Sequence, residues 1–305
     1  MKQIKANPFI GLIAATHTPM KKDGSLNLAV VEKQAAHLLA KNITAVFICG
    51  STGESHSLSV AERLQLARRW SEVLKGTRLR LIVHVGHNAL PEAKTLAADA
   101  AKRGAQAISA LAPNYFKPGS IRDLVDFCAA IAVAAPELPF FFYDIPALTG
   151  VSLPMPEFLT AASNRIPNFA GLKFTNPDFA ALQECLARRR FDILYGNDEL
   201  LLAALTFGVR GAVGSTYNQI APTYHRLIAA FERGDLATAR AEQLNSLRFV
   251  RICANFGYAR AAKAVMSSLG VDCGPVRLPQ RPLTAPECKE LRKELEKSGF
   301  AEWSS

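Results

Sequence analysis

The stretch Phe169-Ala170-Gly171-Leu172-Lys173-Phe174-Thr175 has the composition of a nearly continuous apolar β-strand with a single charged residue. Strands of this kind are typical of parallel sheets, because helices cover both faces of such a sheet. The chain contains eight segments of this length and character, and longer segments with helical periodicity separate them. The eight predicted strands are residues 11–18, 43–50, 80–87, 105–112, 139–145, 169–175, 191–196 and 211–216.

This alternation predicts an α/β fold, a single (β/α)8 TIM barrel formed by residues 1–235. Residues 236–305 are predicted to form additional C-terminal helices packed on the barrel. Predicted helices include 26–40, 60–74, 91–103 and 121–134, with Ser59 and Ser120 as N-caps. An open, doubly wound sheet is the alternative fold, but no Gly-x-Gly-x-x-Gly motif follows the first predicted strand.

The composition of the 305-residue chain, 49% hydrophobic and 20% charged, is that of an ordinary soluble globular protein. The N-terminal residues lack an apolar signal segment, and no apolar run approaches the length of a membrane span. The six cysteines have no Cys-x-x-Cys spacing and lie mostly in apolar segments, which is typical of reduced thiols. Together these features predict a cytoplasmic protein with no membrane partner.

The net charge of +10 raises the question of a polyanionic partner. The basic residues are spread along predicted helix faces and lack the interleaved aromatic residues of nucleic-acid binders. We therefore expect no nucleic-acid partner, and at most an attraction of small anionic substrates.

Lys173 is the first candidate functional residue, because a buried ammonium group is costly unless it is paired. A lysine relieved of its charge in apolar surroundings is a nucleophile that attacks ketones to give Schiff bases. Alternation along the strand places Lys173 and Thr175 on one face, which we expect to point into the barrel. The same rule turns Tyr143 inward near the end of its strand, so its phenol is predicted to approach the Lys173 amine.

Active sites of TIM barrels lie at the carboxyl ends of the strands, where this chain has three polar turns. The turn Gly50-Ser51-Thr52-Gly53-Glu54-Ser55 suits a carboxylate or phosphate, although such a sequence is more often a simple turn. Gly196-Asn197-Asp198-Glu199 places two acids at a predicted helix start, where capping of the helix is the expected role in the absence of further context. The third, Gly211-Ala212-Val213-Gly214-Ser215-Thr216-Tyr217-Asn218, is again small and hydrogen-bonding.

Four histidines near the ends of the first three predicted strands offer a different hypothesis, a metal-dependent hydrolase or class II aldolase. They are His17, His56, His84 and His87. His84 and His87 are three residues apart on a predicted strand and therefore point to opposite faces. We expect no metal; loss of activity on chelation, restored by zinc, would contradict a Schiff-base reaction.

Five motifs in chain order resemble the N-acetylneuraminate lyase family, the sialic acid aldolase branch of the class I pyruvate-dependent aldolases. They are Gly50-Ser51-Thr52-Gly53-Glu54, Tyr143-x-Ile145-Pro146-Ala147-Leu148-Thr149-Gly150, Gly171-Leu172-Lys173, Gly196-x-Asp198-Glu199 and Gly214-Ser215-Thr216-Tyr217-Asn218. Each motif is weak alone, but five at the ends of successive predicted strands are specific. The resemblance runs from Gly11 to about Pro279, nearly the whole chain.

The resemblance implies that Lys173 is the Schiff-base lysine, which condenses with the C2 ketone of open-chain N-acetylneuraminate. It implies that Tyr143 shuttles the proton of the C4 hydroxyl, and that Ser51 and Thr52 hold the carboxylate. Retro-aldol cleavage then gives N-acetylmannosamine and pyruvate with neither a metal nor an organic cofactor. The sugar contacts implied are Gly196, Asp198, Glu199 and Ser215, and Thr175 on the Lys173 face is expected to contact the middle of the substrate.

Alternatives remain within and outside this family. Dihydrodipicolinate synthase shares the lysine, the tyrosine and the Ser/Thr turn, but that branch usually has an arginine where residues 144–149 have none. Asp144 stands where lyases more often show Asn or His, which leaves another 2-keto-3-deoxy acid open as the substrate. A non-catalytic sugar-acid-binding barrel is the alternative of another class, although a pure binder would more often use arginine for a carboxylate.

The resemblance also implies an oligomer. In related enzymes a tyrosine in the region of Tyr115 reaches a neighbouring active site, so a homotetramer is expected.

Overall fold

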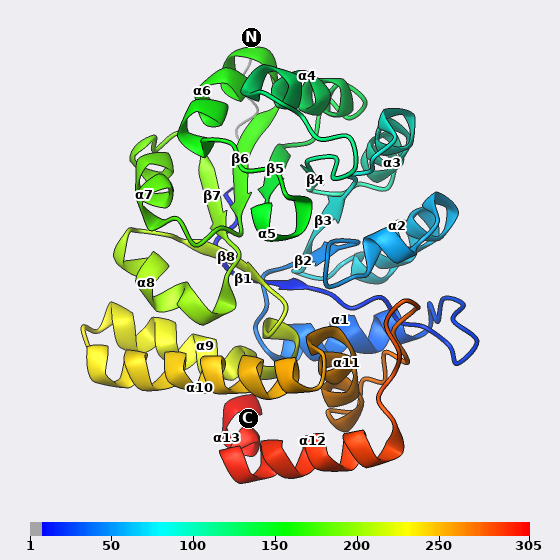
Figure 1. The fold of residues 1–305 in the computed structure, drawn as a ribbon, viewed down its shortest axis with the longest axis vertical. Coiled ribbons are helices and arrows are strands. Elements are labelled where there is room, and N and C mark those ends of the chain that lie inside the picture. Colours follow the sequence, from blue (N-terminus) through cyan, green and yellow to red (C-terminus); the bar gives the residue numbers. More distant parts are fainter. Residues whose placement is uncertain (1–7) are drawn as a thin grey trace.

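The computed structural model describes residues 8–305, which form a closed barrel of eight parallel strands surrounded by helices (Figure 1). The strands are β1 (Gly11–Ala15), β2 (Ala45–Ile48), β3 (Arg80–His84), β4 (Ala107–Leu111), β5 (Phe140–Asp144), β6 (Phe169–Phe174), β7 (Asp192–Tyr195) and β8 (Gly211–Gly214). The barrel closes where β8 pairs with β1, with Gly11 opposite Gly211. Each observed strand lies inside a predicted one, and the predicted (β/α)8 barrel is confirmed.

Helices follow the strands around the outside of the barrel (Figure 1). They are α1 (Val30–Ala40), α2 (Val60–Leu74), α3 (Leu90–Lys102), α4 (Ile121–Ala132), α5 (Pro146–Thr149), α6 (Met155–Arg165), α7 (Phe179–Ala187), α8 (Leu201–Thr206) and α9 (Tyr217–Glu232), with 3-10 turns η1 (Ser55–Ser57) and η2 (Asp198–Leu200). Both predicted N-caps are confirmed: the Ser59 hydroxyl accepts the N–H of Glu62, and the Ser120 hydroxyl accepts that of Asp123.

The helix predicted over residues 26–40 begins four residues later, at Val30. Leu26 instead forms an antiparallel bridge with Met20, and the N–H of Asn27 donates to the carbonyl of Pro19 at 2.9 Å. The prediction was wrong there because these tertiary contacts hold the backbone in a turn, which the apolar spacing of the sequence does not reveal.

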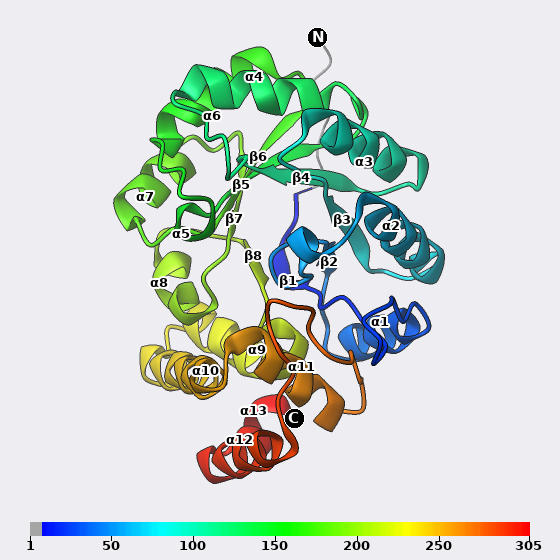
Figure 2. The ribbon, with the colours of Figure 1, turned by 45° about the vertical axis from the view of Figure 1, so that its right-hand side comes forward.

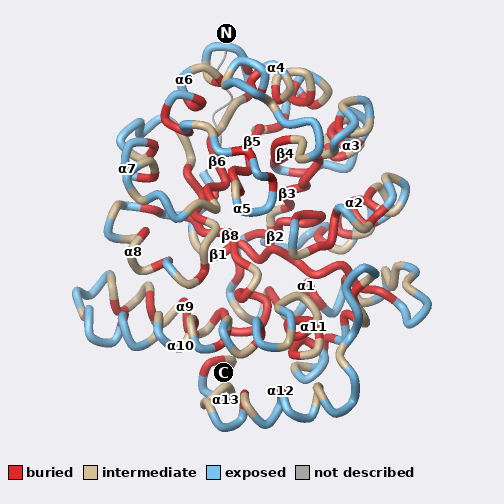
Figure 3. The backbone as a smooth tube through the Cα atoms, in the orientation of Figure 1, coloured by how far each residue is buried: buried red, intermediate tan, exposed pale blue. Residues whose placement is uncertain are grey.

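Alternation along the strands divides the core into two parts. Inward-facing side chains such as Phe47, Phe141 and Tyr143 fill the barrel, whereas Phe142 and Phe174 pack outward against the helices. The strands are therefore largely buried, and most exposed residues lie on the outer faces of the helices and in loops (Figure 3). This is the arrangement that the apolar runs predicted.

Beyond α9 the chain adds α10 (Leu236–Asn255), α11 (Tyr258–Ser268), α12 (Ala285–Ser298) and α13 (Phe300–Ser304). These helices gather on one side of the barrel, where α10 packs along α9 and α12 packs on α10 and α11 (Figure 2). The division of the chain into residues 1–235 and 236–305 stays a prediction. None of the helices within residues 8–305 combines the length and the apolar character that crossing a membrane requires.

Candidate active site

Three cavities in the described chain differ in their place relative to the barrel. One of about 730 Å³ lies between α11 and α12, and one of about 570 Å³ lies at the amino ends of the strands. The third, of about 250 Å³, lies at the carboxyl ends and is lined by Lys173 and Tyr143. It is the smallest of the three, but it is the one at the end of the barrel where TIM-barrel chemistry takes place.

The Lys173 side chain points from β6 into the barrel and is buried, with 4% of the residue exposed. Its Nζ lies 3.8 Å from the centroid of the Tyr143 ring and 4.2 Å from that of Phe47. Among residues 8–305, no carboxylate lies within ion-pair distance of this amine. The amine is therefore not tied to an acid and faces the cavity.

Tyr143 lies directly beside Lys173, since the two residues pair in register on β5 and β6. Its ring packs edge-on against Phe47 and His84. Its hydroxyl lies 3.4 Å from the hydroxyl of Ser51, across the mouth of the barrel. The Tyr143 ring therefore lies close to the Lys173 amine, 3.8 Å from the ring centroid, as strand alternation predicted.

Ser51 and Thr52 line the cavity from the turn between β2 and α2. The turn is held tightly against the loop after β1, because the hydroxyl of Thr18 donates to the carbonyl of Gly53 at 2.6 Å. A Cβ at Gly53 would lie 3.1 Å from the backbone nitrogen of Cys49, so a larger residue would fit only if the surrounding backbone shifted slightly. Two hydroxyls on a fixed turn are suited to a small anion in the cavity.

Thr175, Gly196 and Ser215 complete the opposite wall of the cavity. The Thr175 hydroxyl is buried and has no hydrogen-bond partner within residues 8–305, so it is free to bind a ligand hydroxyl. A Cβ at Gly196 would lie 1.9 Å from this hydroxyl oxygen, which explains the need for glycine.

Asp198 and Glu199, the predicted acids, are not among the residues that line the cavity. Asp198 is buried, and its Oδ2 accepts the N–H of Thr216 at 2.9 Å and the Thr216 hydroxyl at 2.7 Å. The hydroxyl of Ser215 donates to the same oxygen at 3.5 Å. Burial first, and then the charge of Glu199, raise the pKa of Asp198 to about 6.

Two cavity residues from α11, Tyr258 and Ala259, were missed by sequence reasoning. They lie at the start of α11, far along the chain from the strands, and the Tyr258 hydroxyl is 2.7 Å from that of Ser215. Burial raises the pKa of Tyr258 well above its usual value. No sequence motif marks these residues. The one local feature is Gly257, which directly precedes the helix and has a φ of 80°.

The predicted histidines do not assemble into a metal site. Within residues 8–305, no group of three or more His, Cys, Asp or Glu side chains is placed to hold a metal ion. His84 faces the barrel interior with its Nδ1 2.9 Å from the carbonyl of Cys49, and His17 contacts the Gln219 amide at 3.0 Å. Burial lowers the pKa of His17 to about 3 and that of His84 well below its usual value, so both are neutral.

Asp144 points away from the Tyr143 face, as alternation predicted, and its Oδ2 accepts the Asn176 amide at 3.1 Å. Burial raises the pKa of this carboxyl to about 6. Its contacts therefore lie outside the cavity.

The sequence matches the Dihydrodipicolinate synthetase family over residues 8–298. It is 42% identical to the N-acetylneuraminate lyase of Gallus gallus over 275 residues, which cover 88% of this chain and 89% of that protein. It is 43% identical to N-acetylneuraminate lyase A of Xenopus laevis over 273 residues, covering 88% and 90%. The solved structure of Proteus mirabilis N-acetylneuraminate lyase superposes with a TM-score of 0.93 at 38% identity, covering 96% of this chain and all of that one.

These matches confirm the resemblance that the five motifs indicated. By sequence over nearly its whole length, and by a barrel that carries its polar turns at the carboxyl ends of the strands, the chain belongs to the dihydrodipicolinate synthetase family.

Proposed function

We propose that this protein is a class I aldolase that cleaves N-acetylneuraminate reversibly to N-acetylmannosamine and pyruvate through a Schiff base on Lys173. The observation that carries the proposal is the Lys173 amine, which is buried in the barrel, unpaired with any described carboxylate and 3.8 Å from the ring of Tyr143. The similarity to proteins named N-acetylneuraminate lyase supports the choice of sugar.

In this proposal the Lys173 amine attacks the C2 ketone of the open-chain sugar, and loss of water gives a protonated imine. Tyr143 relays the proton of the C4 hydroxyl to the substrate carboxylate, the C3–C4 bond breaks, and the electron pair of that bond moves into the imine to give an enamine. C4 leaves as the aldehyde of N-acetylmannosamine. Protonation of the enamine at C3 and hydrolysis then release pyruvate and regenerate Lys173.

Ser51 and Thr52 are the proposed ligands of the substrate carboxylate. Their turn faces Tyr143, with 3.4 Å between the Ser51 and Tyr143 hydroxyls, so a carboxylate held there lies next to the proton carrier. This arrangement allows the carboxylate to assist the transfer of the C4 proton.

The hydroxylated part of the sugar is proposed to contact Thr175, Gly196 and Ser215, which line the cavity. Asp198 and Glu199 are retained as proposed contacts of the tail; the support for Asp198 is its link to Ser215 at 3.5 Å. Residues 144–149 contain no arginine for a second carboxylate, which favours a neutral polyol aldehyde over a dihydrodipicolinate synthase-like reaction. A panel of 2-keto-3-deoxy acids, assayed by pyruvate release, tests this choice.

Borohydride reduction in the presence of pyruvate tests the covalent step. We expect intact-mass and peptide analysis to find a reduced pyruvyl adduct on Lys173, and no adduct in the Lys173→Met variant. Absence of the adduct from the wild-type protein would refute the aldolase and leave the non-catalytic binder. Tyr143→Phe should keep the adduct but lower turnover by about 100-fold or more, because the proton carrier is lost.

A homotetramer in the cytoplasm is also proposed. Tyr115 and Phe116 support self-association, since this edge-on aromatic pair is 79% and 86% exposed in the loop between β4 and α4. Light scattering on the purified protein measures the assembly, and a monomer would contradict it.

A further inference from the structure

Glu54 follows directly on the Ser51-Thr52-Gly53 turn and has a left-handed backbone, with φ at 55°. A residue other than glycine keeps this conformation only where its surroundings hold it. Its N–H donates to the carbonyl of Ser51 at 3.0 Å. The conformation of Glu54 therefore sets the position of Ser51, which faces the cavity.

The side chain of Glu54 is anchored in the C-terminal part of the chain, more than 200 residues away. Its Oε1 lies 2.6 Å from Nζ of Lys263 on α11, and its Oε2 accepts the N–H of Arg277 at 3.0 Å. The Lys263 side chain is 2% exposed, that of Glu54 is 4% exposed, and Nζ also donates to the carbonyl of Pro275 at 2.7 Å. Separating two charges buried to this degree is costly, so the pair holds its geometry.

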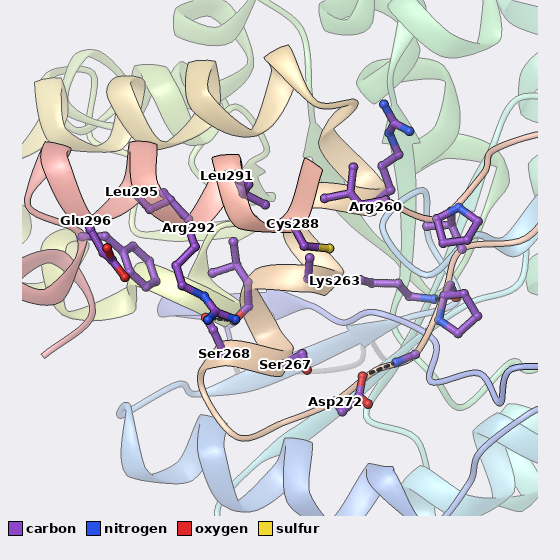
Figure 4. Close-up of a pocket in the computed structure, with 18 residues that line it drawn as sticks. Arg260, Lys263, Ser267, Ser268, Asp272, Cys288, Leu291, Arg292, Leu295 and Glu296 are labelled. Carbon is purple, nitrogen blue, oxygen red and sulfur yellow. Dashed lines mark hydrogen bonds between the residues drawn. The ribbon is translucent and has the colours of Figure 1, made fainter. Parts of the chain in front are cut away.

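Lys263, one member of the pair, lines the cavity of about 730 Å³ between α11 and α12 (Figure 4). In that view the Lys263 side chain leaves α11 and runs along the edge of the cavity, on the side away from the α12 residues Arg292 and Glu296. The ion pair with Glu54 and the hydrogen bond to the carbonyl of Pro275 hold the amine of Lys263 at this edge of the cavity.

The same helix reaches the catalytic cavity. Tyr258 and Ala259 line it from the first turn of α11, and Lys263 follows one turn later. Helix α11 thus forms part of the cavity wall and also holds the Ser51-Thr52 turn, through the contact of Lys263 with Glu54.

We propose that the Glu54–Lys263 ion pair is a positioning device for the carboxylate site, so that α11 completes an active site built on the barrel. The inference rests on the proposed function, because it takes Ser51 and Thr52 as the carboxylate ligands. Glu54 and Lys263 do not touch the substrate; they act through the turn.

The double variant Glu54→Gln/Lys263→Met removes both charges and leaves no unpaired ion in the interior. Glutamine also keeps an oxygen that can accept the N–H of Arg277. With the turn released, we expect the pyruvate concentration for half-maximal borohydride trapping on Lys173 to rise about tenfold, equal to about 1.4 kcal/mol. Trapping at saturating pyruvate should match the wild type, because Lys173 itself is unchanged.

Lys263→Met alone is measured alongside, so that the test does not depend on a single variant folding. Glu242→Gln is the matched control, since it breaks an ion pair of 2.7 Å with Arg226 between α9 and α10. It should leave half-saturation unchanged. A merely structural role would lower the melting temperature of the Glu54 and Lys263 variants without changing half-saturation.

The outcomes separate the two proposals. If wild-type protein is not trapped by pyruvate, the proposed function fails. If the wild type is trapped and the variants reach half-saturation at the same pyruvate concentration, the positioning role alone is wrong.

Discussion

Replacing Asp198 with asparagine removes a carboxyl group whose ionised form is disfavoured by burial. Burial, and after it the negative charge of Glu199, raise the pKa of Asp198 from its ordinary 3.8 to about 6. The hydrogen bonds from Thr216 act in the opposite direction and lower it in part. The folded protein therefore holds this proton more tightly than the unfolded chain does. Ionisation of Asp198 lowers the free energy of unfolding as pH rises through the interval from about 4 to about 6.

The magnitude follows from the pKa difference. A rise from 3.8 to about 6 corresponds to roughly 3 kcal/mol, at about 1.4 kcal/mol for each pKa unit. Asparagine can still accept the Thr216 hydrogen bonds but cannot ionise. The free energy of unfolding of Asp198→Asn relative to the wild type should thus increase by roughly 3 kcal/mol as the pH rises from about 4 to about 7.

Urea unfolding followed by circular dichroism across this pH range measures the difference between the two proteins. Asp144→Asn should also become more stable relative to the wild type as pH rises, because burial also raises the pKa of Asp144 to about 6. Asp126→Asn, on a half-exposed side chain of α4, controls for the loss of a surface carboxylate. If the difference in free energy of unfolding between the wild type and Asp198→Asn does not change with pH, the reasoning is refuted.

Two further substitutions test the cavity walls. Tyr258→Phe removes the hydroxyl 2.7 Å from that of Ser215, and is expected to raise KM for the sugar several-fold, as loss of about 1 kcal/mol implies, while pyruvate trapping is unchanged. An equally large change in pyruvate trapping would contradict a role of Tyr258 limited to binding the sugar. Gly196→Ala puts a methyl group 1.9 Å from the Thr175 hydroxyl and should lower the free energy of unfolding by about 1–3 kcal/mol. Chemical denaturation measures this, and Gly119→Ala, whose nearest neighbour is 3.9 Å away, is the control; equal losses would contradict the steric argument.

The barrel and the inward direction of its key side chains were predictable because both depend on local periodicity. Eight apolar runs separated by helical segments indicate strands buried on both faces, and the two-residue repeat of a strand fixes which side chains share a face. Lys173 and Tyr143 lie on that inner face, next to each other in the register of β5 and β6. The turn with Ser51 and Thr52 was visible as a motif, and it lines the same cavity.

The first helix shows where such reasoning ends. Its spacing predicted a start at residue 26, but the bridge between Leu26 and Met20 delays it to Val30. The competing contact joins the segment to a neighbouring turn, and propensity along the helix carries no information about it.

By itself, then, the sequence determined the strands, the faces of Lys173 and Tyr143, and the polar turns that follow the strands. Only the tertiary structure decided that Asp198 is buried against Thr216, that Tyr258 joins the cavity, and that Lys263 reaches Glu54. The physical reason is that these contacts link residues through the packing of η2 and α11 on the closed barrel. Burial, and with it the pKa of a carboxyl or the strength of an ion pair, depends on which distant segments exclude water from it.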